Sequence, residues 1–244
     1  MRKTLFVFFM LFWAAGITGA AQAGIFDDIL KKLPAAKSAA PSAGLDQKTT
    51  ISGLKEALVI SSKNAVKAVS KKDGYFGNQV VKILLPDNIQ KAADVVAKLG
   101  YQKQVDHLIL SMNRAAEAAA PKAIPLFADA IKSMSIDDAR KILQGGDAAA
   151  TEYFKEKTSA KLYEEFKPVV VANMNKVGVA KAYKNMTAPY EALPLVSSKS
   201  IDLDRYVTSK ALDGLFLIIA EEEKKIRTDP AARVTDLLKT VFGK

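Results

Sequence analysis

The stretch that decides the fold is Leu203–Arg227, which reads LDRYVTSKALDGLFLIIAEEEKKIR. Its first half places apolar residues at helical spacing, and its middle, Leu215–Ile219, is apolar on every side. A helix without a polar face has to be surrounded by other elements, so this segment is predicted to be the central helix of the domain. Its apolar middle is far shorter than the roughly 20 residues that a membrane-spanning helix needs.

Helical periodicity recurs through the rest of the chain. Apolar residues follow a helical stripe over Thr50–Ser70 and, most clearly, over Tyr101–Ala119. Ser135–Asp138 has the pattern of a capping box that opens a short helix. The one β-branched run, Gln79–Leu85, has no second strand to pair with and is predicted to be an extended connector. The sequence therefore predicts an all-α single domain, an irregular orthogonal bundle of about eight to ten helices.

Prolines mark three expected breaks. Pro168 is expected to kink its helix or to end it, because its ring clashes with the preceding turn. Asp229 and Pro230 are expected to cap the last helix, Ala231–Phe242. The segment Tyr183–Ser200, which contains two prolines, is expected to be a long irregular connection.

The first residues have the pattern of a secretory leader. Arg2 and Lys3 form a positive start, Leu5–Trp13 is apolar, and Ala21–Ala23 has the A-x-A form of a cleavage site. We therefore expect export to the periplasm and a mature chain that begins near Gly24. No cysteine follows the leader, so a lipid anchor on an N-terminal cysteine is not expected.

The leader sets the predicted domain organisation: residues 1–23 are the signal peptide, 24–48 a short helix and a linker, and 49–244 the helical domain. Gly24–Leu33 is amphipathic, and it is expected to dock on the domain or, alternatively, to touch a membrane surface. Pro34–Gln47 is rich in Ala, Pro and Ser and has the composition of a flexible linker.

Composition narrows the classes of partner and chemistry. The formal net charge of +10 favours an anionic partner such as a membrane surface, but no run of Lys and Arg with interleaved aromatics supports nucleic-acid binding. The chain has no cysteine and one histidine, His107, so neither a metal site nor thiol or histidine catalysis is expected. Phosphate-loop, dinucleotide, nucleophile-elbow and calcium-loop motifs are absent from the sequence, and no cofactor is expected.

The first candidate site is Asn113, Arg114 and Glu117 within MNRAAEAAAP. Asn113 and Glu117 lie one turn apart on a helix, and the alanines around them allow a ligand or another helix to approach closely. One interpretation is a glutamate held in a cleft, which acts as an acid or base or binds a cation or amine. The other is a packing network in which Arg114 and Glu117 pair with each other, and structural ion pairs often imitate sites in this way.

The second candidate site lies on and after the central helix. Asp213 stands just before its apolar run, where a carboxylate that enters a core needs a partner. Glu222 and Arg227 are expected to clamp the turn into the last helix. A structural role is the leading interpretation of this set as well.

Several segments together resemble a known bacterial family, which is called domain of unknown function 4197. They are GLKEAL (Gly53–Leu58), DGYFGN (Asp73–Asn78), VKILLP (Val81–Pro86), MNRAAEAA (Met112–Ala119), A-I-x-x-M (Ala130–Met134), TEYF (Thr151–Phe154), YVTSKALDGLF (Tyr206–Phe216), EEEKKIRTDPAAR (Glu221–Arg233) and LLKTVFG (Leu237–Gly243). The resemblance covers roughly Gly53–Gly243 and implies an exported, mostly helical single domain. It implies no catalytic residues.

Three hypotheses of function follow. The leading one is a non-enzymatic periplasmic module of the cell envelope that binds a protein or a small ligand. The second is a peripheral binder of an anionic membrane or polymer, suggested by the basic charge and the amphipathic segment Gly24–Leu33. The third is a hydrolase or lyase that uses Glu117 as its carboxylate.

Overall fold

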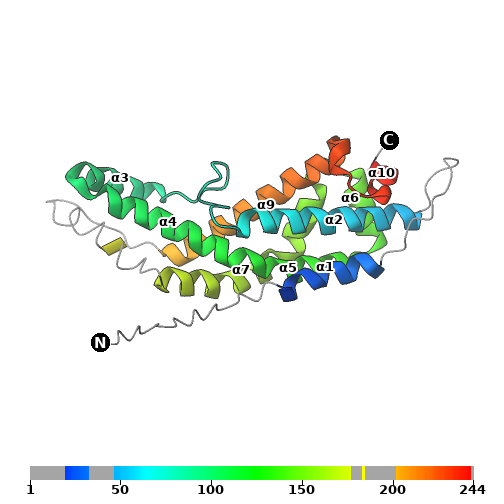
Figure 1. Ribbon diagram of the computed structural model, residues 1–244, viewed down its shortest axis with the longest axis horizontal. Coiled ribbons are helices and arrows are strands. Elements are labelled where there is room, and N and C mark those ends of the chain that lie inside the picture. Colours follow the sequence, from blue (N-terminus) through cyan, green and yellow to red (C-terminus); the bar gives the residue numbers. More distant parts are fainter. Residues whose placement is uncertain (1–19, 33–46, 177–182, 185–201, 243–244) are drawn as a thin grey trace, which may run out of the picture.

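The computed structural model describes residues 20–32, 47–176, 183–184 and 202–242, and every helix in it belongs to one bundle (Figure 1). In chain order the α-helices are α1 (Ala20–Lys32), α2 (Gln47–Ser70), α3 (Asp87–Val96), α4 (Gln102–Ala119), α5 (Ala123–Ser133), α6 (Ile136–Gln144), α7 (Ala149–Lys176), α9 (Leu203–Thr228) and α10 (Asp236–Phe242). A π-helical turn, η1 (Ala97–Tyr101), joins α3 to α4, and short 3₁₀ turns, η2 (Ala120–Lys122) and η3 (Pro230–Ala232), precede α5 and α10.

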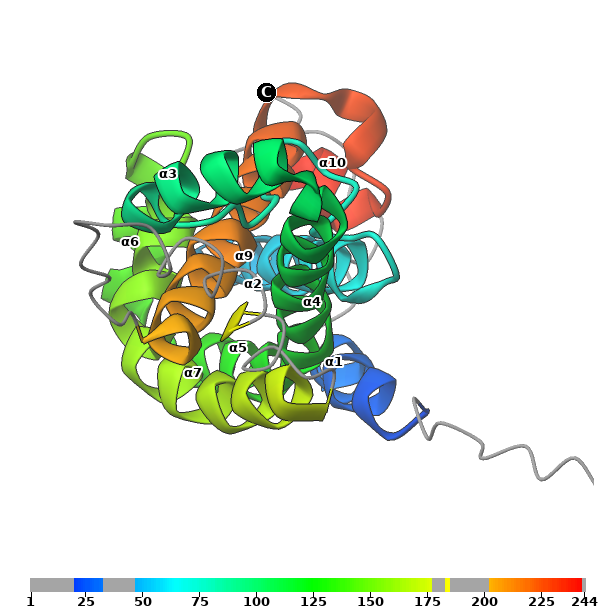
Figure 2. The same cartoon turned by 90° about the vertical axis from the view of Figure 1, so that its left-hand side faces the viewer.

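The all-α single domain predicted from the sequence is confirmed, and the described residues contain no strand. Seven of the described helices have ten residues or more, slightly fewer than the eight to ten expected, and α6 and α10 are shorter. Helices α2, α4 and α9 run roughly along the long axis of the molecule rather than crossing at right angles (Figure 1). In the view along that axis, α4, α5 and α7 surround α2 and α9 (Figure 2).

Helix α9 is central, as its sequence predicts. It packs against α2, α4 and α7, and twelve of its residues are buried. The apolar run Leu215–Ile219 is nevertheless not enclosed on every side, because Leu217 is 43% exposed. Burying four of five consecutive apolar residues is enough to place the helix in the core, and a single exposed leucine is common on protein surfaces.

Helix α1 packs on the domain, in agreement with the docking alternative for Gly24–Leu33. Phe26 and Ile29 are buried in the main core, where α1 contacts α5 and α2. Burying two large apolar side chains contributes about 3 to 6 kcal/mol relative to leaving them in water. Both side chains follow the expected cleavage site at Ala23, so a mature chain retains them.

Of the two alternatives for Pro168, a kink or an end of the helix, the end was wrong, because Pro168 lies inside α7. The cap expected at Asp229 was also misplaced. Pro168 is exposed, so the carbonyl that loses its N–H partner can bond to water instead. Asp229 does not cap the last helix; its side chain accepts the N–H of Ala231 and so caps the turn η3.

Some predictions fall outside the described residues. They are most of the signal peptide (1–19), most of the Ala/Pro/Ser-rich linker (33–46) and most of the connection between α7 and α9 (177–182 and 185–201). Within the described part of the chain, no helix is long and apolar enough to cross a membrane.

The loop between α2 and α3, Lys71–Pro86, runs along the bundle (Figure 1). Near its start, Asp73 adopts the left-handed region at φ 64°, and Gly74 follows. A Cβ atom on Gly74 would lie 2.4 Å from the carbonyl oxygen of Val69, so only glycine fits this turn. The second part of the loop, Lys82–Pro86, is extended without being part of a sheet, and we refer to it as the connector.

Candidate functional site

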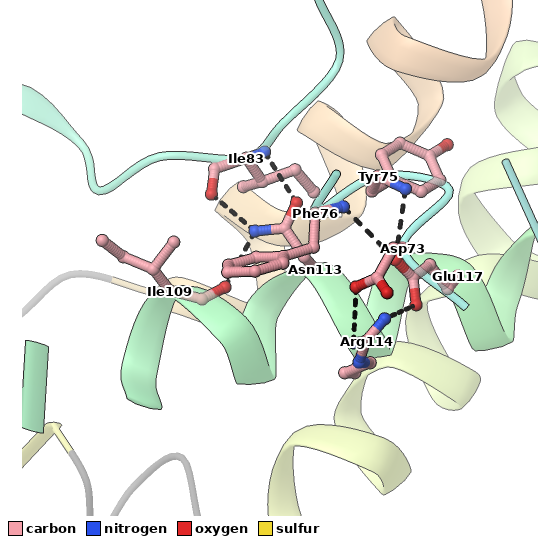
Figure 3. Close-up of polar contacts among 8 residues, drawn as sticks. All are labelled: Asp73, Tyr75, Phe76, Ile83, Ile109, Asn113, Arg114 and Glu117. Carbon is pink, nitrogen blue, oxygen red and sulfur yellow. Dashed lines mark hydrogen bonds and ion pairs between the residues drawn. The ribbon is translucent and has the colours of Figure 1, made fainter. Parts of the chain in front are cut away.

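Three side chains of α4, those of Asn113, Arg114 and Glu117, hold the loop that precedes α3 (Figure 3). Three of the four alanines of the MNRAAEAA stretch, Ala115, Ala116 and Ala119, are fully buried, and Ala118 is exposed. Because their side chains are small, neighbouring segments can approach α4 closely. The sequence grouped these three polar residues correctly, and the structure adds the segment that they bind.

The side chain of Asn113 bonds to both backbone groups of one connector residue, as a neighbouring strand would. Its Oδ1 accepts the N–H of Ile83 at 2.8 Å, and its Nδ2 donates to the carbonyl oxygen of Ile83 at 2.8 Å. Nδ2 also donates to the carbonyl of Ile109 in its own helix at 2.8 Å. Asn113 has no exposed surface, so these three bonds satisfy an amide that would otherwise be costly to bury.

Glu117 binds the turn that precedes the connector. Its Oε1 accepts the N–H of Tyr75 at 3.1 Å and that of Phe76 at 3.3 Å. Its Oε2 accepts Nη1 of Arg114 at 2.6 Å. Both carboxylate oxygens are therefore occupied, and Glu117 is buried.

Arg114 contacts both the buried Glu117 and a residue at the surface, Asp73. Its Nη2 donates to Oδ1 of Asp73 at 2.7 Å, and the Asp73 side chain is about half exposed. The hydrogen bond to Glu117, followed by that to Asp73, raises the pKa of the Arg114 guanidinium, so the arginine stays charged. The packing interpretation of this cluster matches these contacts, with the difference that α4 is tied to a loop rather than to a second helix.

Tyr75 locks the same turn onto the central helix. Its ring is fully buried, and its hydroxyl donates to the carbonyl oxygen of Ala211 in α9 at 2.6 Å. The ring lies against Gly214, where a Cβ atom would come within 2.8 Å of Cε1 of Tyr75. Gly214, rather than the neighbouring Asp213, is thus the residue of the Asp-Gly pair on which the packing depends.

The position expected for Asp213 was wrong. Its side chain is 70% exposed and lies 3.5 Å from the ammonium group of Lys210. Asp213 does not enter the core, because it points away from the buried face of α9 that carries Gly214. It takes no part in the Asn113 cluster.

Glu222 and Arg227 do not form the clamp that the sequence suggested. Glu222 instead contacts Nδ2 of Asn64 at 3.1 Å and Nζ of Lys225 at 2.6 Å. The turn after α9 is held by Arg233, whose guanidinium donates to the carbonyls of Ile226 and Arg227.

Arg227 pairs with Glu223, which the sequence analysis did not single out. Oε1 of buried Glu223 accepts the N–H of Ala150 at 2.9 Å and two bonds from Arg227, at 3.0 and 3.1 Å. Its Oε2 accepts the N–H and the hydroxyl of Thr151, both at 2.9 Å. A buried carboxylate thus caps the first turn of α7, where backbone N–H groups have no helical partner.

A sequence signal for this second cluster was available. Glu223 and Arg227 lie four residues apart on a helix, which places an acid and a base side by side. The run Glu221–Glu223 does not reveal which glutamate faces inward, because that depends on how α9 is rotated in the bundle. Asp73 gave no comparable signal, since its contact with Arg114 joins residues distant in the chain.

The carboxylates of Glu117 and Glu223 already accept hydrogen bonds from the protein itself, and this limits the reactions and ligands that are open to them. A cavity of about 10 Å³ lies beside Glu223 and Arg227, with Leu54, Leu58 and Phe242 in its wall, and this volume holds about one water molecule. In the described part of the chain, no three His, Cys, Asp or Glu side chains are placed to hold a metal ion. The geometry of both clusters fits the anchoring of backbone segments.

The fold and these clusters define a cysteine-free helical bundle domain with two buried glutamate–arginine anchors. The chain belongs to the family described as "Protein of unknown function (DUF4197)", whose match covers residues 44–243. The family resemblance seen in the sequence is thereby confirmed. No curated protein and no solved structure matches the chain significantly.

Proposed function

We propose that this chain is a non-enzymatic binding module of the cell envelope and that it binds a protein partner along the connector. One observation carries the proposal: Asn113 holds Ile83 by both backbone groups, and the neighbouring side chain of Leu84 is left 56% exposed. Val80, just before the connector, is 61% exposed. A rigid extended segment with outward apolar side chains is suited to pairing with an extended peptide.

The side chains of the connector alternate as in a strand. Ile83 and Leu85 of the connector are buried, as is Val81 just before it, while Leu84 faces solvent. The carbonyl of Leu84 accepts the hydroxyl of Tyr206 at 3.0 Å, whereas its N–H has no hydrogen-bond partner among the described residues. A partner can offer a carbonyl group to this N–H and an apolar side chain to Leu84. Because the connector is already ordered before binding, less conformational entropy is lost when the complex forms.

Export to the periplasm is the second part of the proposal. The positive start, the apolar stretch Leu5–Trp13 and the small residues at Ala21–Ala23 support it. Fractionation of cells, with N-terminal sequencing of the purified chain, tests this part. A periplasmic chain that starts near Gly24 supports it, and a cytoplasmic chain that keeps Met1 contradicts it.

A hydrolase or lyase based on Glu117 is disfavoured by the contacts of that residue. A general base needs a free lone pair within reach of the substrate proton. Both oxygens of Glu117 accept hydrogen bonds within the protein, and the carboxylate is buried. These contacts fit an anchor of the loop better than an acid or base.

The binding proposal is tested by photo-crosslinking in living cells. A photoreactive residue at position 84 is compared with one at position 136, because Ile136 is 55% exposed and lies on α6, outside the connector. The adduct found at position 84 alone is identified, and its affinity for the purified chain is measured. We expect Leu84→Asp to weaken that binding at least about tenfold, since a charge replaces an apolar contact, and Ile136→Asp to leave it unchanged.

Two results contradict the proposal. One is the absence of any adduct at position 84 in several growth conditions. The other is a partner whose affinity is the same for the wild type and Leu84→Asp, which would show that the partner binds elsewhere.

A further inference from the structure

The turn between α3 and α4 exposes apolar side chains at one end of the bundle, at the left in Figure 1 and facing the viewer in Figure 2. Leu99 is 53% exposed and Tyr101 is 39% exposed. Gly100 between them adopts φ 93°, a conformation that favours glycine and reverses the chain. We refer to Lys98–Lys103 as the tip.

The exposed apolar side chains of the tip lie outside the core. None of the residues of η1 is buried, whereas the helices behind it are firmly packed. Ile89, Ala93 and Val96 of α3 and Val105 and Leu108 of α4 are all buried in the main core. The fold therefore holds the tip on a stable hairpin without needing Leu99 or Tyr101 for its own packing.

The charged side chains of the tip itself are all positive. Lys98 and Lys103 are exposed on either side of the apolar pair, and residues 95–105 contain no carboxylate. The nearest acidic residues in the sequence, Asp94 and Asp106, lie further back on the two helices, where they accept hydrogen bonds from Gln90 and Gln102. Without Arg2 and Lys3 of the expected leader, the formal net charge of +10 becomes 10 − 2 = +8, which still adds to the attraction for an anionic surface.

We propose that the tip docks on an anionic lipid surface. Leu99 and Tyr101 enter the interface between headgroups and acyl chains, where an aromatic ring with a polar end is favoured. The ammonium groups of Lys98 and Lys103 stay at the level of the headgroup phosphates, where each lysine strengthens binding by about fivefold.

The size and shape of the tip favour lipid over protein. A stable protein interface buries about 800 Å² on each partner, and a turn with two exposed apolar side chains provides only a small part of that area. A bilayer instead accepts single side chains inserted from a projecting turn. With two apolar residues and two lysines, the attachment is weak and reversible, and it weakens as salt screens the charges.

The test uses the exported chain and vesicles of phosphatidylglycerol mixed with phosphatidylcholine. Trp13 is the one tryptophan of the sequence and lies in the expected leader, so an introduced tryptophan reports alone. We expect Leu99→Trp to show a blue-shifted emission when these vesicles are added at low salt. Ile136→Trp, on another exposed apolar position, is the matched control and is expected to show no shift.

Sedimentation with the same vesicles measures the strength of binding. The double variant Leu99→Ser and Tyr101→Ser is expected to lower the partition coefficient at least about tenfold. The double variant Lys98→Gln and Lys103→Gln is expected to lower it by about 30-fold at low salt and much less at high salt. Ile136→Ser and Val234→Ser, in apolar positions away from the tip, are expected to bind as the wild type does.

Three results would overturn the inference: no sedimentation of the wild-type chain at low salt, equal binding to vesicles of phosphatidylcholine alone, or equal loss in the tip and control variants. A protein crosslinked to position 99 but not displaced by vesicles would assign the tip to a protein partner instead. None of these results bears on the connector, because the tests at Leu84 use different residues and a different partner.

Discussion

Two buried glutamates of this molecule make nearly the same contacts in different settings. Glu117 accepts the N–H groups of Tyr75 and Phe76 and pairs with Arg114, whereas Glu223 accepts those of Ala150 and Thr151 and pairs with Arg227. Glu223 caps a helix, where unpaired N–H groups always occur. Glu117 anchors an irregular loop, and its arginine continues to the half-exposed Asp73. The comparison shows what a buried glutamate with an arginine beside it can do. Such a pair suggests an active site when only the sequence is known, but here its carboxylate accepts hydrogen bonds from backbone N–H groups that have no backbone partner.

The largest expected effect comes from removing the glutamate whose arginine partner is the more buried of the two, since Arg227 is 16% exposed and Arg114 is 28% exposed. Glu223→Ala leaves the N–H groups of Ala150 and Thr151 without their acceptor and leaves Arg227 with only the carbonyl of Ile142, so it is expected to lower the free energy of unfolding by about 3 to 5 kcal/mol. Glu117→Ala is expected to cost less, about 2 to 3 kcal/mol, because Arg114 retains Asp73 and is closer to water.

Urea unfolding of both variants measures this difference. Glu152→Ala is the control, since Glu152 lies on the exposed surface of α7, and its effect is expected to stay within about 0.5 kcal/mol of zero. A greater loss for Glu117→Ala than for Glu223→Ala would contradict the ranking of the two anchors.

The next effect concerns the connector, which Asn113 alone holds by both backbone groups of Ile83. Asn113→Ala leaves the buried N–H and C=O of Ile83 unpaired, and it is expected to lower the free energy of unfolding by about 2 kcal/mol. Asn64→Ala, which removes an exposed amide in contact with Glu222, is expected to change stability little. Thermal unfolding compares the two variants, and equal midpoints would show that Asn113 is not an anchor.

Tyr75 makes the loop sensitive to high pH. Its pKa is raised above the usual value of about 10, first by burial and then by the charge of Glu117. The folded chain keeps this proton at a pH where the unfolded chain releases it, so stability is fully present below about pH 10 and is lost as pH rises above it. Tyr75→Phe is expected to lose about 1 kcal/mol at neutral pH, because the bond to Ala211 is gone.

Between about pH 9 and about pH 11, an interval that contains the usual tyrosine pKa, the stability of Tyr75→Phe is expected to fall less than that of the wild type. Urea midpoints of both chains at these two pH values provide the measurement. Parallel falls in the wild type and the variant would mean that Tyr75 does not contribute to the alkaline loss.

The smallest effect is expected at Asp73, the half-exposed residue that pairs with Arg114. Asp73→Asn removes the exposed ion pair with Arg114 and keeps a side chain that tolerates the left-handed backbone. Exposed pairs are worth about 0 to 1 kcal/mol, so the loss is expected to be below 1 kcal/mol and to vanish at high salt. A loss as large as that of Glu117→Ala would show that the surface pair, not the buried carboxylate, holds the turn.

Local pattern was enough to predict the helices and the central place of α9. The capping box at Ser135 and Asp138 forms as its spacing predicts. Leu217 departed from expectation, and Pro168 did not end its helix, because the packing and the water around a residue, which a local pattern does not contain, decide what a leucine or a proline does at a given helix face.

The candidate site was predictable only within one helix. Asn113, Arg114 and Glu117 share a face of α4 and could be grouped by spacing. Their partners Asp73, Tyr75 and Ile83 lie 30 to 42 residues away along the chain, and no pattern in a single sequence connects them. Asp213 was misplaced for a related reason: the rotation of α9 is set by the fit of Gly214 against the Tyr75 ring.

Amide hydrogen exchange of the loop between α2 and α3 tests the central claim most directly. The account predicts slow exchange for the N–H groups of Tyr75, Phe76 and Ile83, and fast exchange for that of Leu84, one residue further on. In Asn113→Ala, the protection of Ile83 should disappear while that of Tyr75 remains. Fast exchange at all four amides would show that the polar residues of α4 do not pin the loop, and slow exchange at Leu84 would show that the edge proposed for a partner is already covered.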